Sequence, residues 1–227
     1  MHKSHLPTAT LLLAAIYSAG TSAAPDLEGT WILFGGEDFS APARTPLNTR
    51  LQESYDFAHD DPSLDCIPAS WTRVYSNPNT PLEIIQQDDQ VVINFELFDI
   101  RRTIPLIEPG EAAHHRLADP NNPTLGDNLG WYEGDELVVH GVNYGDQYRV
   151  LTTIRGWAGL QQSPLLVTEE RYRRSSEDEL ELTITHYDPL MYTRPLGVVY
   201  ELDAEYEWQV APYNCEPEEA SVNTLAP

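Results

Sequence analysis

The chain has 227 residues, with 36 acidic and 13 basic side chains, and a formal net charge of −23. That length is typical of one domain, and an apolar content of 41% is enough for a packed core and too high for a disordered chain. We do not expect so acidic a chain to bind nucleic acid or an anionic membrane surface, because phosphate recognition needs clustered Lys and Arg. Two cysteines exclude a disulfide-dense scaffold and a cysteine-rich zinc module.

The first 24 residues have the pattern of a secretory signal peptide. Lys3 gives the segment a positive start, an apolar stretch follows over residues 11–19, and small residues close it at 21–24. The apolar stretch is too short to span a bilayer. We therefore expect a cleaved leader over residues 1–24 and a periplasmic or secreted protein. Because Lys3 is the only lysine, the mature chain would have none, which excludes Schiff-base chemistry and a P-loop.

The mature chain alternates apolar and polar residues with a period of two, which indicates β-strands. Roughly ten strands are expected, and in chain order they fall within residues 30–34, 71–75, 82–86, 91–98, 100–106, 129–132, 136–142, 148–154, 165–174, 179–187 and 198–210. Turn residues at 87–90, 133–135 and 175–178 predict hairpins between neighbours.

Successive hairpins make an up-and-down meander, and closing it into a barrel removes the exposed edges. We expect an all-β fold, a single up-and-down antiparallel β-barrel over residues 25–215, followed by a disordered tail over 216–227. The long Pro-containing segments 40–70 and 108–128 are expected to form loops at one end, of the kind that act as lids or binding loops.

The two cysteines, Cys66 and Cys215, are expected to pair in an oxidising compartment and to close one long loop. In the chain-entropy model such a loop stabilises the folded state by roughly 4–5 kcal/mol. The alternative is two unrelated buried thiols. A cysteine nucleophile is not expected, because neither residue has a histidine neighbour in the sequence.

Short motifs add a resemblance to known proteins. Gly29-Thr30-Trp31 resembles the Gly-x-Trp start of the first strand in lipocalin-like barrels, where the tryptophan plugs the closed end. A wider set is similar to a family of exported, mostly proteobacterial proteins of unknown function. The motifs that carry this similarity are Gly29-Thr30-Trp31 again, Asp-Asp-Pro at 60–62, Cys-Ile-Pro at 66–68, Pro-Leu-Glu-Ile-Ile-Gln at 81–86, the segment 130–139, Glu-Arg-Tyr-Arg-Arg at 170–174 and Asp-Pro at 188–189. The resemblance implies export and a β-architecture, and no activity.

Three polar residues fall on apolar faces of the expected strands. His186 continues the face of Leu180, Leu182 and Ile184, Glu170 shares a face with Leu166 and Tyr172, and Arg102 shares one with Ile100 and Ile104. A buried charge costs several kcal/mol unless it is paired. We therefore expect Arg102 and Glu170 to satisfy each other or a ligand. The alternatives are a structural ion pair that braces the barrel and a core histidine that is only hydrogen-bonded.

Two functions from different classes fit this pattern. The first is a binding protein that holds a small, largely apolar molecule, such as a lipid, terpenoid, steroid or aromatic, with Arg102, Trp131, Tyr132, His115 and His140 as candidate ligand contacts. The second is a cofactor-free lyase, isomerase or hydratase that uses His186 and Glu170 as an acid–base pair, with Tyr172 as a further catalytic candidate. A structural envelope protein with a filled core is a third possibility.

No cofactor or metal is expected. The histidines at 59, 114, 115, 140 and 186 show no ligand spacing, and no nucleophile elbow or dinucleotide-binding glycine motif is present. Histidines from separate loops could still converge on a metal, and Asp60-Asp61 could bind a hard cation, although no full oxygen-ligand loop is visible.

Overall fold

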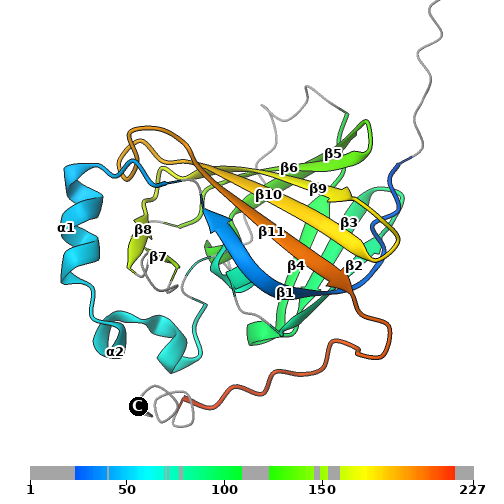
Figure 1. The fold of residues 1–227 in the computed structure, drawn as a ribbon, viewed down its shortest axis with the longest axis horizontal. Coiled ribbons are helices and arrows are strands. Elements are labelled where there is room, and N and C mark those ends of the chain that lie inside the picture. The colour runs from blue at the N-terminus through cyan, green and yellow to red at the C-terminus, as the bar shows by residue number, and fades with distance from the viewer. Residues whose placement is uncertain are drawn as a thin grey trace, which may run out of the picture.

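A computed structural model describes residues 24–39, 41–68, 70, 72–76, 79–108, 123–145, 149–152 and 159–217. Within these residues, one antiparallel sheet of nine strands curls into a barrel (Figure 1). Its strands are β1 (Gly29–Phe39), β2 (Pro81–Gln86), β3 (Gln90–Phe95), β4 (Ile100–Pro105), β5 (Asp127–Glu133), β6 (Glu136–Val142), β9 (Val167–Arg174), β10 (Glu179–Tyr187) and β11 (Leu196–Ala204). The expected all-β, single antiparallel barrel is confirmed.

The first and last strands of the chain pair in the middle of the sheet, and the two edge strands, β4 and β5, meet to close the barrel. The strand order is β4-β3-β2-β1-β11-β10-β9-β6-β5, so β1 pairs with both β2 and β11. Eight antiparallel pairings separate β4 from β5, and these two strands therefore run parallel where they meet. Their seam is held by a parallel bridge between Leu106 and Gly130, with the Ile107 amide donating to the Gly130 carbonyl at 2.9 Å.

Alternation along each strand separates the barrel interior from its outer face. In β10, Leu180, Leu182, Ile184 and His186 are buried, and the residues between them are partly exposed. The inward residues of the other strands join them in one apolar cluster that fills the barrel. This is the period-two pattern that the sequence predicts for a sheet with one wet face.

The two ends of the barrel are built differently. At the end that we call the closed end, the β2–β3, β5–β6 and β9–β10 turns meet the segment before β1. Trp31 is 1% exposed there, and its indole N–H donates to the Leu27 carbonyl at 3.0 Å. The Arg174 guanidinium lies over the Trp31 ring, 5.2 Å from its centroid. A buried tryptophan thus fills the closed end.

The opposite end, which we call the covered end, lies beneath an added layer (Figure 1). That cover consists of α1 (Pro46–Ser54) and the small hairpin of β7 (Arg149–Thr152) and β8 (Leu160–Gln162). A second apolar cluster joins the cover to the β10–β11 connection; its members are Leu47, Leu51, Leu160, Met191, Tyr192 and Leu196. The short helix α2 (Phe57–Asp60) follows α1.

Several expected boundaries are wrong, each for a local reason. Residues 72–76 form a 3₁₀ helix and not a strand. The expected loop 40–70 contains α1, which begins because the Thr45 side chain accepts from the Asn48 amide and Pro46 occupies the first turn. β8 has only three residues, too few to show a period.

The last expected strand ends early. β11 stops at Ala204 because β10, its partner, begins at Glu179, opposite Asp203. Beyond this point Tyr206 is 73% and Trp208 51% exposed, so they do not continue the inward face. The chain instead crosses the outside of the barrel (Figure 1).

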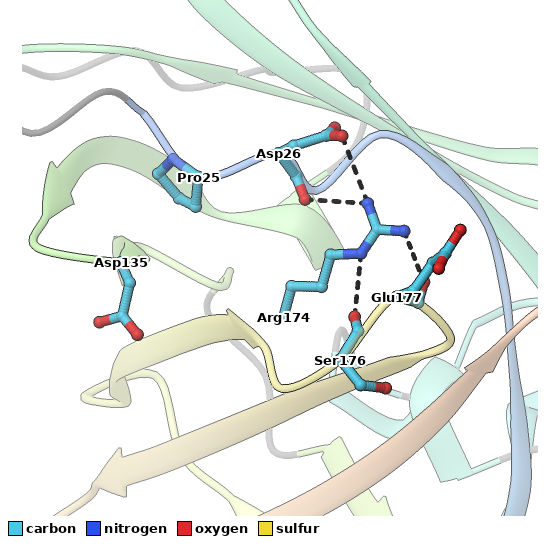
Figure 2. A pocket seen from close by; sticks show the side chains of 6 residues that line it. All are labelled: Pro25, Asp26, Asp135, Arg174, Ser176 and Glu177. Carbon is cyan, nitrogen blue, oxygen red and sulfur yellow. Dashed lines mark hydrogen bonds and ion pairs between the residues drawn. The ribbon is translucent and has the colours of Figure 1, made fainter.

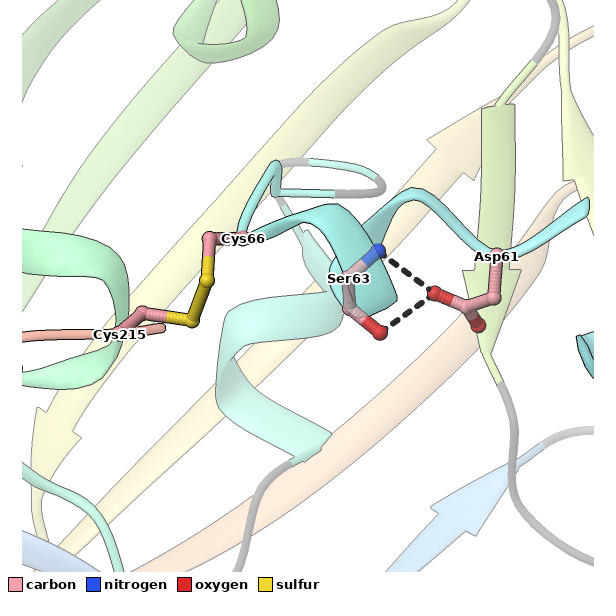
Figure 3. The surroundings of a disulfide bond; sticks show 4 residues. All are labelled: Asp61, Ser63, Cys66 and Cys215. Carbon is pink, nitrogen blue, oxygen red and sulfur yellow. Dashed lines mark hydrogen bonds between the residues drawn. A yellow bond between two sulfur atoms is a disulfide. The ribbon is translucent and has the colours of Figure 1, made fainter. Parts of the chain in front are cut away.

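A disulfide joins Cys66 to Cys215, which confirms the expected pairing (Figure 3). Cys66 directly follows a 3₁₀ helix (Pro62–Asp65), whose first turn is capped by Asp61 accepting from the Ser63 amide at 2.9 Å. The bond spans 149 residues of sequence and holds the segment after β11 against the loop before β2. Figure 3 shows the cap and the disulfide at opposite ends of this short helix.

The expected leader, most of the tail and the loop with His114 and His115 lie outside the described residues. No helix in the described part of the chain is both long and apolar enough to cross a membrane.

Candidate functional site

Arg102 and Glu170 form a buried ion pair inside the barrel, as the alternation predicts. Arg102 comes from β4 and Glu170 from β9, and their side chains are 1% and 0% exposed. The two guanidinium NH₂ groups donate to the two carboxylate oxygens, each at 2.6 Å. Burial alone would lower the pKa of Arg102, but the carboxylate of Glu170 raises it, and the net pKa lies above its ordinary value. The guanidinium is therefore charged and paired.

Two tyrosines and an asparagine complete this network. The Tyr172 hydroxyl donates to Glu170 Oε2 at 2.7 Å, and the Tyr75 hydroxyl lies 2.5 Å from that of Tyr172. Asn128 Oδ1 accepts from Arg102 at 2.5 Å. Burial, and then the charge of Glu170, raises the pKa of both tyrosines well above 10. Both oxygens of the Glu170 carboxylate thus accept hydrogen bonds from protein donors.

His186 lies elsewhere, near the covered end. It is 1% exposed, and its Nδ1 lies 3.2 Å from the Leu196 carbonyl oxygen. Burial lowers the pKa of His186 to about 4, against a weaker opposing effect of that hydrogen bond. Its other ring nitrogen, Nε2, is buried and has no hydrogen-bond partner among the described residues.

Buried polar residues gather around the covered end. Asn48 of α1 donates to the Met191 carbonyl at 3.2 Å and accepts from the Gln161 amide at 3.3 Å. Ser163 donates to Asp188 from its amide at 2.6 Å and from its hydroxyl at 2.8 Å. These bonds tie the cover to the connection between β10 and β11.

Gln162 lies between Gln161 and Ser163 in the sequence but does not share in these hydrogen bonds. It is 1% exposed, and within the described part of the chain neither its amide nitrogen nor its amide oxygen has a hydrogen-bond partner. Leaving buried polar atoms without partners costs about 1–3 kcal/mol for each group. The covered end therefore holds unmet hydrogen-bonding capacity on two side chains, His186 and Gln162.

The expected acid–base pair of His186 and Glu170 is not formed. In the β9–β10 register Glu170 lies opposite Ile184, whereas His186 lies opposite Thr168. Among the described residues, no hydrogen bond or ion pair joins His186 to Glu170; each has its own partners.

The other residues that were expected to contact a ligand do not join the Arg102–Glu170 network. Trp131 and His140 lie opposite Val138 and Glu169 in register. They share a face with these residues, opposite to the face of Leu137 and Val139, which belong to the core cluster, so they are on the outside of the barrel. Tyr132 packs against the core at the closed end, where it bonds Gln86 at 2.8 Å. His115 is outside the described residues.

Three residues of these buried polar groups were not expected from the sequence. Asn128 shares the inward face of Gly130 and Tyr132, so alternation alone could have found it. Tyr75 lies in a 3₁₀ helix, which has no strand pattern to follow. Gln162 lies in a three-residue strand, which is too short to carry a signal.

A second buried ion pair braces the loop before β2. The Asp61 carboxylate, 0% exposed, accepts from Arg73 at 2.8 Å and from the Tyr55 hydroxyl at 2.6 Å. Burial would raise the pKa of Asp61, but bonds from Arg73, Ser63 and Tyr55 lower it. Asp61 belongs to the Asp-Asp-Pro motif, and here the residue has a structural role.

Two hollows lie on the outside of the closed end. One, of about 500 Å³, surrounds Arg174, whose guanidinium donates to the carbonyls of Asp26, Ser176 and Glu177 (Figure 2). The other, of about 250 Å³, is lined by Trp31 and by the exposed Tyr206 and Trp208, among others. Arg174 already bonds several carbonyls in this crevice.

No group of three or more His, Cys, Asp or Glu side chains among the described residues is placed to hold a metal ion. The His59 side chain, for example, is exposed on α2, and its Nδ1 lies 2.9 Å from Asp56 Oδ2.

Comparison with known proteins gives a fold likeness. No family model matches the chain, and no curated protein matches it. Among solved structures the chain is similar to the crystal structure of a mutant of the fluorescent protein UnaG. The identity is 14%, the TM-score is 0.37, and the match covers 80% of this chain and 97% of the other.

Proposed function

We propose that the barrel binds a small, largely apolar molecule at its covered end. The observation that supports this is the layer of buried polar side chains between two apolar clusters, in which His186 Nε2 and the Gln162 amide have no hydrogen-bond partner within the residues that the structure describes. A ligand between the clusters would bury apolar surface on both sides and supply the missing hydrogen bonds.

The middle of the barrel is a poorer location for the ligand. There the Glu170 carboxylate already accepts hydrogen bonds from Arg102 and Tyr172, so its oxygens are occupied by protein donors. The cover is a separate packing unit, so it can be displaced without breaking the barrel sheet. We expect the ligand to enter where α1 and β8 meet the β10–β11 connection.

Binding is favoured over acid–base catalysis. A general base needs a free proton-accepting group and a partner that orients it. Glu170 is engaged by Arg102 and Tyr172, and His186 contacts a backbone carbonyl in place of a carboxylate. The network around Glu170 is best explained as a brace between β4, β5 and β9.

We also propose that the protein is exported, with residues 1–24 removed. The disulfide supports this, because such bonds persist in oxidising compartments. Mass measurement of the mature chain from its own host tests it. A mature chain that begins after residue 23 or 24 is expected, and retention of Met1 would contradict export by this leader.

Native mass spectrometry of the protein purified from its own host tests the binding function. We expect an added mass of a few hundred daltons that is lost on denaturation and partitions into organic solvent. A bare protein mass, together with no binding of decyl-chain or aromatic probes, would contradict the proposal.

A further inference from the structure

We infer that the ligand is a neutral molecule with a hydrogen-bond donor, an alcohol in preference to a carboxylate, and that this donor binds Nε2 of His186. The inference rests on the proposed binding function and specifies the chemistry of the bound group. It comes from the hydrogen-bonding pattern at the covered end.

The partner of Nδ1 determines what Nε2 can do. A carbonyl oxygen only accepts hydrogen bonds, so the 3.2 Å contact with Leu196 requires the proton on Nδ1. Since burial holds the pKa of His186 near 4, the ring is neutral at pH 7. Nε2 then carries a lone pair and no proton, and it is a buried acceptor without a donor.

The backbone makes this orientation stable. His186 is the last inward residue of β10, and it lies directly opposite Leu196, the first residue of β11. Thr168 of β9 lies opposite His186, and its hydroxyl is hydrogen-bonded to that of Tyr144. No group in the described part of the chain is hydrogen-bonded to Nε2, so we infer that its donor comes from a bound molecule.

Charge decides between an alcohol and an anion. The buried Asp188 carboxylate lies two residues after His186, just beyond the end of β10. Arg102 is the one buried arginine among the described residues, and Glu170 already neutralises it through two bonds. A carboxylate would be a further buried negative charge near Asp188 and would offer Nε2 no donor, whereas a hydroxyl donates to Nε2.

Gln162 offers a second contact of the same kind. Its unpartnered amide carries both a donor and an acceptor, so it can receive the hydroxyl oxygen or a second polar group. Ser163, the next residue, is fixed to Asp188 only two positions after His186. The two unsatisfied side chains thus belong to the same end of the barrel.

Three decyl compounds of matched length test the inference: 1-decanol, its methyl ether and decanoic acid. Calorimetric titration at pH 7 should give the alcohol an affinity about tenfold above that of the ether and acid, since a buried acceptor without a donor is costly. In His186→Phe the alcohol should lose its advantage over the ether. His186→Gln, which retains an acceptor at the same reach, should keep most of it.

His140→Phe, on the outer face, is the matched control and should bind all three compounds as the wild type does. Circular dichroism and thermal melting establish that each variant is folded. Equal affinity of the ether and the alcohol, or an alcohol preference unchanged in His186→Phe, would overturn the inference while leaving the binding function in place. Failure of all three compounds to bind would contradict both.

Discussion

A buried ion pair inside an apolar barrel needs both of its members. The Coulomb attraction between Arg102 and Glu170 offsets the large cost of removing each charge from water, and Tyr172 and Asn128 add further hydrogen bonds to the pair. Removing one member leaves the other charged and uncompensated. The pair therefore has its main effect on stability and strand placement.

We predict a strongly non-additive double-mutant cycle for this pair. Arg102→Met and Glu170→Leu should each lower the free energy of unfolding by about 3–5 kcal/mol, because each leaves a buried charge unpaired. The double variant should cost less than the sum of the two by several kcal/mol. Urea denaturation measures all four proteins. Additive losses would show that the pair does not stabilise the fold as described.

His186 should make stability depend on pH. Its pKa is about 4 when folded and 6.5 in the unfolded chain, so the unfolded state binds more protons between these values. Stability from His186 is thus fully present above pH 6.5 and is lost as the pH falls through 4. From pH 7 to pH 4.5 the loss should be about 2 kcal/mol.

The variant His186→Phe isolates this effect, because both proteins share all other titrating groups. The measured quantity is the free energy of unfolding of each at pH 7 and pH 4.5. The variant should lose about 2 kcal/mol less than the wild type over this range. Parallel pH profiles would mean that the imidazole is not held neutral by burial.

Alternation along the strands was sufficient to place Arg102, Glu170 and His186 inside the barrel. It also led to the expectation that Arg102 and Glu170 could pair, but it could not reveal their further partners, because those depend on which strands become neighbours and in what register. The bond from Asn128 to Arg102 crosses the parallel seam, and Tyr75 reaches Tyr172 from a 3₁₀ helix. Pairing across the fold is a tertiary property that one strand's pattern does not contain.

At the scale of elements, the seam between β4 and β5 depends on a glycine. A Cβ added to Gly130 would lie 2.9 Å from Ile104 Cγ2 and 3.4 Å from Leu106 Cδ2. The missing side chain lets the two parallel strands approach. In a closed meander of nine strands, an odd number, the two edge strands run parallel where they meet. Here a single bridge joins them in the described residues, so few backbone hydrogen bonds can compensate for an added side chain.

We predict that Gly130→Val weakens the seam. It should lower the free energy of unfolding by about 1–3 kcal/mol through overpacking. The Ile107 amide, which bonds to the Gly130 carbonyl, should exchange with solvent faster. Gly134→Asn is the matched control, since it lies in a turn with open space and asparagine tolerates a positive φ. Unchanged Ile107 exchange in Gly130→Val would contradict this view of closure.

The elements that the sequence did not reveal are short or irregular. α1 has nine residues and β8 three, and neither supplies enough turns or alternations for a pattern to emerge. The cap at Thr45-Pro46 was the usable signal for α1. The end of β11 at Ala204 followed from where its partner begins, since residues 205–210 keep the alternation without a neighbour to pair with.

At the scale of the whole molecule, the disulfide connects parts that the sheet does not. The segment after β11 contacts the barrel through the Ala211 amide on Glu96, the Tyr213 amide on Asp99 and the Tyr213 ring on Phe98. These contacts are exposed and weak, so Cys66–Cys215 is the strong attachment.

Removing the disulfide should loosen this segment and destabilise the fold. In Cys66→Ser/Cys215→Ser we expect the free energy of unfolding to fall by about 4–5 kcal/mol, as the chain-entropy model gives for so long a loop. The Ala211 and Tyr213 amides should lose their exchange protection, while those of β9 and β10 keep theirs. Retained protection at both amides would mean that the surface contacts suffice.

Hydrogen–deuterium exchange with and without saturating 1-decanol tests most directly whether a ligand occupies the covered end. Binding there should slow exchange in α1, in β8 and where β10 joins β11, and should leave the closed end around Trp31 and Arg174 unchanged. Slower exchange at the closed end alone, or no change anywhere at a concentration that saturates the protein, would contradict the proposed site.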